Sequence, residues 1–473
     1  MTAAAARLSP RVLNRALLSR QYLLRRHDLP ERDGVEHLVG MHSQIPVGPY
    51  VALWSRLGNY RPEPLSTMVS ERELVRTALM RSTIHLVTAE DCLTLRPLVQ
   101  PVLDRDLHQN SAHSAAVRGL DLDAVVERGL ALLDERPRTP SELGKALHEH
   151  WPDRKPETLA YAVRNLAALV QIPPRGTWNG TGRAVHASAR TWLGRPIDPA
   201  PSMERLILRY LAAFGPASVQ DVQAWCGLTR LGEVVDRMRP QLRAYLDENG
   251  KELFDVPEAE LPDPGVPAPP RYLPEYDNVF LSHARRDRII PEGLSFAEWC
   301  RKHGLLMTVR GGVLRGNLLI GGLLQGIWRV DKAKRAYTLV AGPFTDVSER
   351  TVKCWRRKAS PCWGSRSRRG SRSTFRCYPC RTSGSADTQA MVTSTATSSR
   401  MRGPVVLRCR WRPSRTSVTA TAAVHTAGTV ASPQPRRAAT CSSSKEHAAD
   451  ASAVRFHARF VRSGCSPRSC FIR

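Results

Sequence analysis

Apolar residues recur at helical spacing near the start of the chain. After Ser9, the apolar side chains of Val12, Leu13 and Ala16 share one face of a helix. Ser9 suits the capping position of this helix, and Pro10 suits its first turn, where a missing N–H costs nothing. The same periodicity predicts two further helices, at about residues 33–41 and 50–57.

Two runs of strand-forming residues follow these helices. Residues 73–80 and 83–88 predict a β-hairpin whose connection contains Arg81 and Ser82. Helices followed by a hairpin are typical of a winged helix, so we predict one such domain over residues 1–118.

The same order of elements occurs again over residues 119–198. Thr139 and Glu142 have the spacing of a capping box, which predicts a helix through Leu147. A second helix is predicted at residues 156–169. The glycines of residues 174–186 then predict a hairpin, which would complete a second winged helix.

The third unit, residues 199–260, contains the strongest turn signal of the chain. Asn249-Gly250 lies between two short strand-like runs, a pattern that favours a tight hairpin. The elements predicted in this unit are helices at residues 203–214, 219–226 and 231–242, and strands at residues 243–246 and 252–255.

A proline-rich linker at residues 261–270 separates these units from a different kind of sequence. Short strand-like runs predict a β-rich domain over residues 271–350, which we expect to be incomplete. The predicted fold class is therefore α+β: tandem winged-helix domains, then a truncated β-rich domain, then a disordered tail. Three winged helices in tandem favour nucleic-acid binding over metabolic catalysis.

Most of the net charge of +27 comes from the end of the chain. Residues 351–473 hold 24 basic and 3 acidic side chains, 8 of the 11 cysteines, and Leu407 as their single leucine. A segment so poor in leucine cannot fill a hydrophobic core. Residues 1–350 hold 46 basic and 40 acidic side chains. Their small positive net charge, and not that of the tail, is the charge relevant to binding nucleic acid.

Three interpretations of this tail remain open. Cys377 and Cys380, with Cys354 and Cys362 upstream, allow a zinc knuckle, and the many Arg, Ser and Thr residues allow a flexible polycationic arm. We prefer a third interpretation, translation out of frame from about residue 351, because this composition is what a shifted frame of a GC-rich gene yields. The nucleotide sequence of the gene tests the frameshift interpretation, which fails unless a shifted reading frame restores a leucine-rich ending.

Several classes of protein are excluded by the pattern of residues. The longest apolar run, residues 318–328, is broken by glycines and Gln325, and is too short to span a membrane. The first residues lack the apolar segment of a signal peptide, and Cys92, Cys226 and Cys300 are too scattered for a disulfide framework. We expect a cytoplasmic protein, associated with the nucleoid when it binds DNA. Without metal-binding or nucleotide-binding motifs, no metal or cofactor is expected.

Six segments, in order along the chain, form one recognisable series: LVGMHSQIPVGPYVALWSRL (38–57), MRSTIHLV (80–87), PPRGTWNGTG (173–182), FGPASVQDVQAW (214–225), ELFDVP (252–257) and RYLPEYDNVFLSH (271–283). The series resembles the AlkZ-like winged-helix DNA glycosylases, and the resemblance covers most of residues 10–344. It implies three winged helices and a β-rich domain around damaged DNA, and hydrolysis of the N-glycosidic bond of an alkylated purine, including crosslinked or bulky adducts.

The resemblance points to His42 and Gln44 as catalytic residues, because they match the polar-X-Gln triplet of the family. A purine alkylated at N7 or N3 is cationic and leaves as a neutral base, so the enzyme must mainly place a water beside an oxocarbenium-like sugar. His42, with a near-neutral pKa, would accept the proton of that water, and Gln44 would orient the water and stabilise the sugar. The alternative is that both side chains cap the end of a helix.

This sequence departs from the family at four positions. His42 replaces the glutamine of the best-known members, and Ser43 replaces an apolar residue, which we expect to loosen the seat of the triplet. Arg285 stands where the family usually has aspartate, and Gly321 replaces an acidic residue. We therefore expect a poorer local fit in the β-rich domain.

Arginine, asparagine and tryptophan side chains on the predicted hairpins and helices suit contacts with phosphates, base edges and exposed bases. For His85, on the first hairpin, a bond inside the sheet is an equal alternative. The expected DNA-binding residues are Arg81, His85, Arg164, Asn165, Arg175, Trp178, Asn179 and Arg183.

Glu275, Asp277 and Asp287 lie in or just after the LPEYDN motif. They could stabilise the oxocarbenium, but we prefer a structural role, in which a buried carboxylate pairs with the arginines of residues 283–288. The sequence thus predicts a monofunctional DNA glycosylase, monomeric, acting on double-stranded DNA with alkylated purines. The alternative is a non-catalytic winged-helix regulator of transcription.

Overall fold

The computed structural model describes residues 5–290, 298–299, 315–333, 336–344, 375–377 and 405–409. These residues belong to one compact unit, Met1–Pro413. Its first helix, α1 (Pro10–Arg20), begins as predicted, with the Ser9 hydroxyl accepting the N–H of Val12. Within the described part of the chain, no helix is both long and apolar enough to cross a membrane.

The second predicted helix is shorter than expected. It forms α2 (Glu31–His37) and stops before residue 41, since Val39 and Gly40 have φ values of 52° and 83°. The next two residues form a short strand, β1 (Met41–His42), and the third predicted helix is α3 (Gly48–Arg56).

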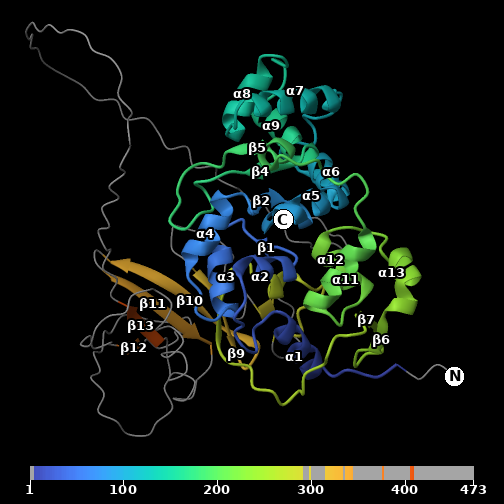
Figure 1. The fold of residues 1–473 in the computed structure, drawn as a ribbon, viewed down its shortest axis with the longest axis vertical. Helices are drawn as coiled ribbons and strands as arrows, with labels where there is room; N and C mark the ends of the chain where they lie inside the picture. The colour runs from blue at the N-terminus through green and yellow to red at the C-terminus, as the bar shows by residue number, and fades with distance from the viewer. Residues whose placement is uncertain are drawn as a thin grey trace, which may run out of the picture. The chain divides into compact units, whose positions relative to one another are not determined.

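The first two predicted hairpins contribute to a single antiparallel sheet (Figure 1). Within this sheet Thr77 pairs with Val170, which joins segments almost a hundred residues apart. The strand order is β1-β3-β2-β4-β5, with β2 (Leu74–Ala78), β3 (Ile84–Thr88), β4 (Leu169–Gln171) and β5 (His186–Ser188).

The second predicted hairpin is wrong in one respect. Residues 174–186 do not pair with each other as two strands; instead β4 and β5 pair, and residues 172–185 form the loop that joins them. Pro173 and Pro174 lack the N–H that a ladder requires, and three glycines follow, so this stretch forms turns. We call residues 172–185 the β4–β5 loop.

Besides α3, six helices lie in the chain between the strands of this sheet, and a further helix, α10, follows its last strand. Three of them, α7 to α9, form a separate hydrophobic core and lie together in Figure 1, and the second begins with the predicted capping box of Thr139 and Glu142. The helices are α4 (Pro62–Ser70), α5 (Ala89–Leu98), α6 (Gln100–Gln109), α7 (Leu122–Glu135), α8 (Pro140–His148), α9 (Pro156–Leu166) and α10 (Ala189–Leu193).

The third predicted unit is reproduced most closely. Helices α11 (Met203–Phe214) and α12 (Val219–Cys226) have the predicted bounds, and α13 (Gly232–Met238) continues into a short 3-10 turn. Strands β6 (Arg243–Leu246) and β7 (Glu252–Asp255) pair as predicted around Gly250, whose φ is 81°. That the three units are winged-helix domains stays a prediction.

The remaining strands form a second sheet, in the order β12-β13-β11-β10-β9-β8. Two of them, β12 and β13, lie within residues 351–473, where the sequence predicted a disordered tail, so these two short segments differ from that prediction. Cys354, Cys362 and Cys380 lie outside the described residues. The elements are β8 (Arg271–Pro274), α14 (Asn278–Leu281), β9 (Arg315–Ile320), β10 (Leu323–Ala333), β11 (Ala336–Pro343), β12 (Phe375–Cys377) and β13 (Val405–Cys409).

Candidate active site

The predicted catalytic triplet, His42-Ser43-Gln44, lies at the edge of the first sheet. His42 is opposite His85 in the ladder between β1 and β3, and the Ser43 N–H donates to the Ile84 carbonyl at 2.7 Å. One side of the triplet is therefore bound to a neighbouring strand through its backbone.

A side chain from a distant part of the chain binds the other side of this strand. The His42 N–H donates to the Asn278 amide oxygen at 3.3 Å, and the Asn278 amide nitrogen donates to the Gly40 carbonyl at 2.8 Å. One carboxamide thus satisfies a donor and an acceptor on the outer edge of β1, as a further strand would.

A buried ion pair holds Asn278 in place. Arg56, at the end of α3, donates two hydrogen bonds to the Asp277 carboxylate, at 2.7 and 2.8 Å, and both side chains are 0% exposed. Asp277 also caps α14 by accepting the Val279 N–H. We expected a buried carboxylate to pair with the arginines of residues 283–288. The buried carboxylate, Asp277, pairs with Arg56 instead, and the pair that does form there, Asp287 with Arg285 at 3.0 Å, lies at the surface.

The His42 ring is enclosed by aromatic neighbours. Its centroid lies 5.6 Å from that of His85 and 5.1 Å from that of Tyr276, and the residue is 9% exposed. Burial, and to a lesser degree the charge of Arg81, lower the pKa of His42 to about 4. The expected near-neutral pKa is thus wrong: at neutral pH the imidazole is uncharged and accepts hydrogen bonds, but it is a weak base.

Gln44 lies at the surface, one residue past the buried Ser43. Its amide oxygen accepts the Ile84 N–H at 3.2 Å, which fixes the orientation of the carboxamide. Because an amide oxygen has two lone pairs, a second donor such as a water can still bind there. Gln44 therefore combines a fixed geometry with access to solvent.

Ser43 is not the weak point that the sequence suggested. It is fully buried, and its hydroxyl and carbonyl accept hydrogen bonds from Arg76 at 3.0 and 2.7 Å. The middle of the triplet is seated by these polar contacts in place of apolar packing, which corrects the expectation of a looser seat.

Four of the expected DNA contacts are buried or partly buried. Asn165 is 0% exposed and His85 is 3% exposed, with its Nδ1 3.0 Å from the Thr83 carbonyl. Arg81 donates to the Trp225 carbonyl, and Arg164 donates to the Ser82 carbonyl at 3.0 Å. Asn165 and His85 are too buried to contact DNA, which corrects the expectation for these two residues. Contacts of Arg81 and Arg164 with DNA stay predictions, because both side chains are only partly buried.

The β4–β5 loop carries the other expected contacts. Asn179 and Arg183 are exposed, whereas Arg175 donates to the Gly182 carbonyl at 3.0 Å and closes the loop on itself. Trp178 packs on Tyr50 of α3, with ring centroids 5.2 Å apart. Asn179 and Arg183 are thus the two members of the expected set whose side chains are most open to a ligand.

The remaining departures from the family pattern lie at the surface. Arg285 is exposed in its pair with Asp287, and Gly321 occupies the turn between β9 and β10 with a φ of 61°. A left-handed φ in an open turn favours glycine over an acidic residue, so the backbone explains Gly321.

Sequence reasoning missed Asn278, Arg76 and Tyr276 as residues around the triplet. Tyr276 and Asn278 belong to the LPEYDN motif, which was recognised only for its acidic members. Nothing in the sequence marks Arg76 as a partner of the triplet. Alternation along a strand shows which side chains are buried, but not which of them forms a hydrogen bond with a distant part of the backbone. In the part of the chain that the structure describes, no three histidine, cysteine or acidic side chains gather as a metal site.

Comparisons with known proteins show which family the chain resembles. A family model described as DNA glycosylase AlkZ-like matches residues 35–361. The interstrand DNA cross-link repair glycosylase of Streptomyces sahachiroi is 21% identical over an alignment of 369 residues, which covers 72% of this chain and 92% of that protein. The solved structure of the Streptomyces sahachiroi DNA glycosylase AlkZ superimposes with a TM-score of 0.60 at 19% identity, covering 75% of this chain and 96% of that one. That likeness shows a shared fold.

Proposed function

Because the chain belongs to the AlkZ-like family of DNA glycosylases, we propose that it hydrolyses the N-glycosidic bond of purines alkylated at N3 or N7. The proposal includes bulky or crosslinked adducts, in keeping with the name of the relative from Streptomyces sahachiroi. The observation that carries it is the setting of His42 and Gln44: a backbone bound on both sides, a neutral buried imidazole, and an exposed oriented amide.

The chemistry fits a weak base. An N7-alkylated or N3-alkylated purine departs as a neutral molecule, so no strong general acid is required. A water that has begun to bond to the oxocarbenium-like carbon becomes a strong acid, and a base with a pKa of about 4 can then accept its proton. His42 is that acceptor in our proposal, and Gln44 orients the water through its amide oxygen and places its dipole beside the sugar.

DNA binding in this proposal uses the β4–β5 loop. Asn179 and Arg183 are the exposed members of the expected set, and an exposed arginine suits a phosphate contact. We further propose that the enzyme is monofunctional, with water as the only nucleophile, and that it acts as a monomer.

The test is release of 7-methylguanine from methylated duplex DNA by purified His42→Ala and Gln44→Ala proteins. Loss of a positioned acid-base or water-orienting group should lower the single-turnover rate by roughly 10²- to 10⁴-fold. Binding to abasic-site DNA should stay within about threefold of the parent, because only the chemical step is removed.

His108→Ala serves as the matched control, since His108 is an exposed histidine on α6. This variant should release base at the parental rate. Undiminished release by both triplet variants would refute the assignment of His42 and Gln44, and an absence of release by the parent on every alkylated substrate would refute the activity.

A further inference from the structure

One arginine lies between the triplet and the β4–β5 loop. Arg76 of β2 is 1% exposed, and its guanidinium donates from Nε to the Ser43 hydroxyl at 3.0 Å and from one terminal nitrogen to the Ser43 carbonyl at 2.7 Å. The Ser43 carbonyl belongs to the planar peptide group that ends at the Gln44 nitrogen. Holding that oxygen therefore fixes the plane from which Gln44 starts.

The rest of this guanidinium has few polar contacts. Its other terminal nitrogen is buried and has no hydrogen-bond partner within the described residues. Burial, and then the charge of Arg175, lowers the pKa of Arg76 to about 10, so the side chain stays charged at neutral pH. A buried charge with an unsatisfied donor is costly, so stability alone explains this arrangement poorly.

The β4–β5 loop packs directly on Arg76 at Gly176. This glycine is buried, and an added Cβ would lie 2.5 Å from the Arg76 Cδ and 3.3 Å from its Nε. Atoms do not approach so closely, so a side chain at this position would have to displace the arginine. The φ of Gly176, 101°, also favours glycine. The backbone of the loop thus limits where the Arg76 side chain can lie.

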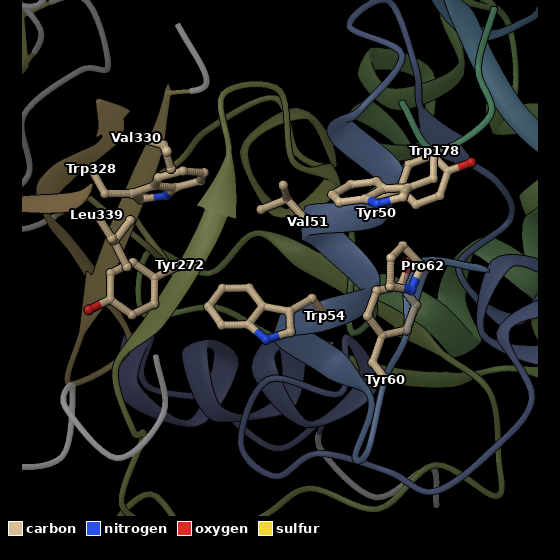
Figure 2. Close-up of a pocket in the computed structure, with 10 residues that line it drawn as sticks. All are labelled: Tyr50, Val51, Trp54, Tyr60, Pro62, Trp178, Tyr272, Trp328, Val330 and Leu339. Atoms are coloured by element: carbon tan, nitrogen blue, oxygen red, sulfur yellow. The ribbon is translucent and has the colours of Figure 1, made fainter. Parts of the chain in front are cut away.

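Neighbouring helices fix the loop at this point. The Tyr50 hydroxyl on α3 donates to the Gly176 carbonyl at 2.8 Å, and the Tyr50 ring packs on Trp178 of the loop, with centroids 5.2 Å apart (Figure 2). The Trp178 N–H donates to the Ser66 hydroxyl on α4 at 3.0 Å. These contacts hold Gly176 in place against Arg76.

We propose that Arg76 is a positioning residue for Gln44, and that Gly176 holds Arg76 against Ser43. The inference rests on the proposed function, because it concerns how the Gln44 amide is aimed at the reacting water. It gives the β4–β5 loop a second task besides contact with DNA. The buried part of the loop supports the triplet, while its exposed side chains stay open to a ligand.

Single-turnover release of 7-methylguanine from methylated duplex DNA tests the role of Arg76. Arg76→Ala removes both hydrogen bonds to Ser43 and should slow release by about 10- to 100-fold, while binding to abasic-site DNA stays within about threefold of the parent. Arg76→Lys keeps a donor but lacks the fixed fork of the guanidinium, so it should recover part of the rate.

Arg96→Ala is the matched control. Arg96 is 2% exposed and donates to the carbonyls of Asn165 and Ala167, so its loss removes a buried arginine without removing a bond to the triplet. This variant should release base at the parental rate. Melting curves identify any variant that has lost its fold, and Arg76→Lys compared with Arg96→Lys then decides.

Gly176→Ala tests the contribution of the loop. The added Cβ should displace Arg76 and slow release about as much as Arg76→Ala does. Combined with Arg76→Ala, the same change should slow release no further, because the crowded atoms are gone. Gly194→Ala is the control for backbone strain, since Gly194 also has a positive φ, 65°, but an added Cβ there would meet no atom within 4 Å.

Hydrogen exchange measured by NMR separates this inference from the proposed function. The Ile84 N–H donates to the Gln44 amide oxygen, so its exchange reports the position of Gln44 whether or not the protein releases base. Exchange should be at least about tenfold faster in Arg76→Ala and Gly176→Ala than in the parent and the two controls.

A parent that releases no base would refute the proposed function, and the exchange rates would then decide the inference by themselves. The inference is overturned if the folded Arg76 and Gly176 variants match their controls in Ile84 exchange. It is equally overturned if an active parent and these variants release base at the same rate.

Discussion

The triplet and the β4–β5 loop are both predicted to face DNA, yet they are built in opposite ways. The triplet backbone is bound by β3 on one side and by Asn278 on the other, with Arg76 beneath Ser43. The loop is anchored on neighbouring elements at two points, where the Gly176 carbonyl accepts from Tyr50 and the Trp178 N–H donates to Ser66. Beyond these anchors, the side chains of Asn179 and Arg183 are exposed.

This difference separates two requirements of a base-releasing enzyme. A group that acts on a reacting water must be held in one geometry before the substrate arrives. A group that contacts a phosphate needs charge and access, and gains little from a rigid backbone. The fixed backbone of the triplet suits the first proposed role and the exposed side chains of the loop suit the second, so each region can be tested by changes that leave the other intact.

The largest expected effect comes from breaking the buried ion pair between Arg56 and Asp277, next to Asn278. Arg56→Ala leaves the Asp277 carboxylate buried without its partner, which should lower the free energy of unfolding by about 3–5 kcal/mol. Urea denaturation followed by circular dichroism measures this change.

Arg237→Ala is the control, because Arg237 forms an exposed pair with Glu204 at 3.4 Å. Its loss should change the free energy of unfolding by less than about 1 kcal/mol. Equal destabilisation by the two variants would contradict the structural role of the Arg56–Asp277 pair.

The third unit and the first sheet differ in how well their structure could be predicted from the sequence. The helices of residues 203–226 and the hairpin around Asn249-Gly250 depend on local periodicity and turn chemistry, and they were predicted almost to the residue. The pairing of β2 with β4 joins Thr77 to Val170. No local pattern contains that contact, because it is decided by which exposed strand edges meet in the folded chain.

The candidate site shows the same limit. His42 and Gln44 were found through a motif, and the polar residues of the hairpins through their chemical type. Chemical type does not reveal the partner: Arg164 bonds the Ser82 carbonyl, while Arg183, equally basic, faces solvent. Asn278 was overlooked because its partners, Gly40 and His42, are more than two hundred residues away in the chain.

Acidic pH should lower the free energy of unfolding through a buried histidine at the end of the β4–β5 loop. His186, at the start of β5, is buried, and burial followed by the charges of Arg164 and Arg76 lowers its pKa from 6.5 to about 4. The unfolded chain therefore binds more protons between these pH values. Above pH 6.5, His186 is neutral in both states and does not change the free energy of unfolding. As the pH falls from 6.5 towards 4, the free energy of unfolding decreases by up to roughly 3 kcal/mol.

Melting temperatures measured from pH 7 to pH 4 check this expectation. His186→Gln removes the titrating group, so its melting temperature should fall less steeply with acid than that of the parent. Parallel slopes for the parent and His186→Gln would contradict the prediction.

Loss of the outer clamp on β1 should affect the chemical step more than DNA binding. Asn278→Ala leaves the His42 N–H and the Gly40 carbonyl without their partner, and a displaced triplet should slow base release by about 10- to 100-fold. KM should stay within about threefold, because no DNA-contacting group is removed. Asn278→Asp keeps an acceptor for the His42 N–H and should recover part of the rate.

Asn317→Ala is the matched control for this clamp, since the Asn317 side chain donates to the Glu275 carbonyl at 3.1 Å and not to the backbone of β1. It should retain the parental rate. A uniform loss of rate in Asn278→Ala, Asn278→Asp and Asn317→Ala would show general damage to the fold, and would argue against a positioning role for Asn278.

The smallest expected effect distinguishes an exposed loop residue from a buried one of the same predicted role. Arg183→Ala should weaken binding to duplex DNA only a few-fold, lower the slope of log affinity against log salt by about 1, and leave stability within about 0.5 kcal/mol. Asn165→Ala should do the reverse, destabilising the protein by about 1–3 kcal/mol without changing the salt slope, because Asn165 is 0% exposed. Fluorescence anisotropy at several salt concentrations, paired with melting curves, separates the two outcomes. An unchanged slope in Arg183→Ala would remove the β4–β5 loop from the DNA interface and leave the triplet as its best-supported part.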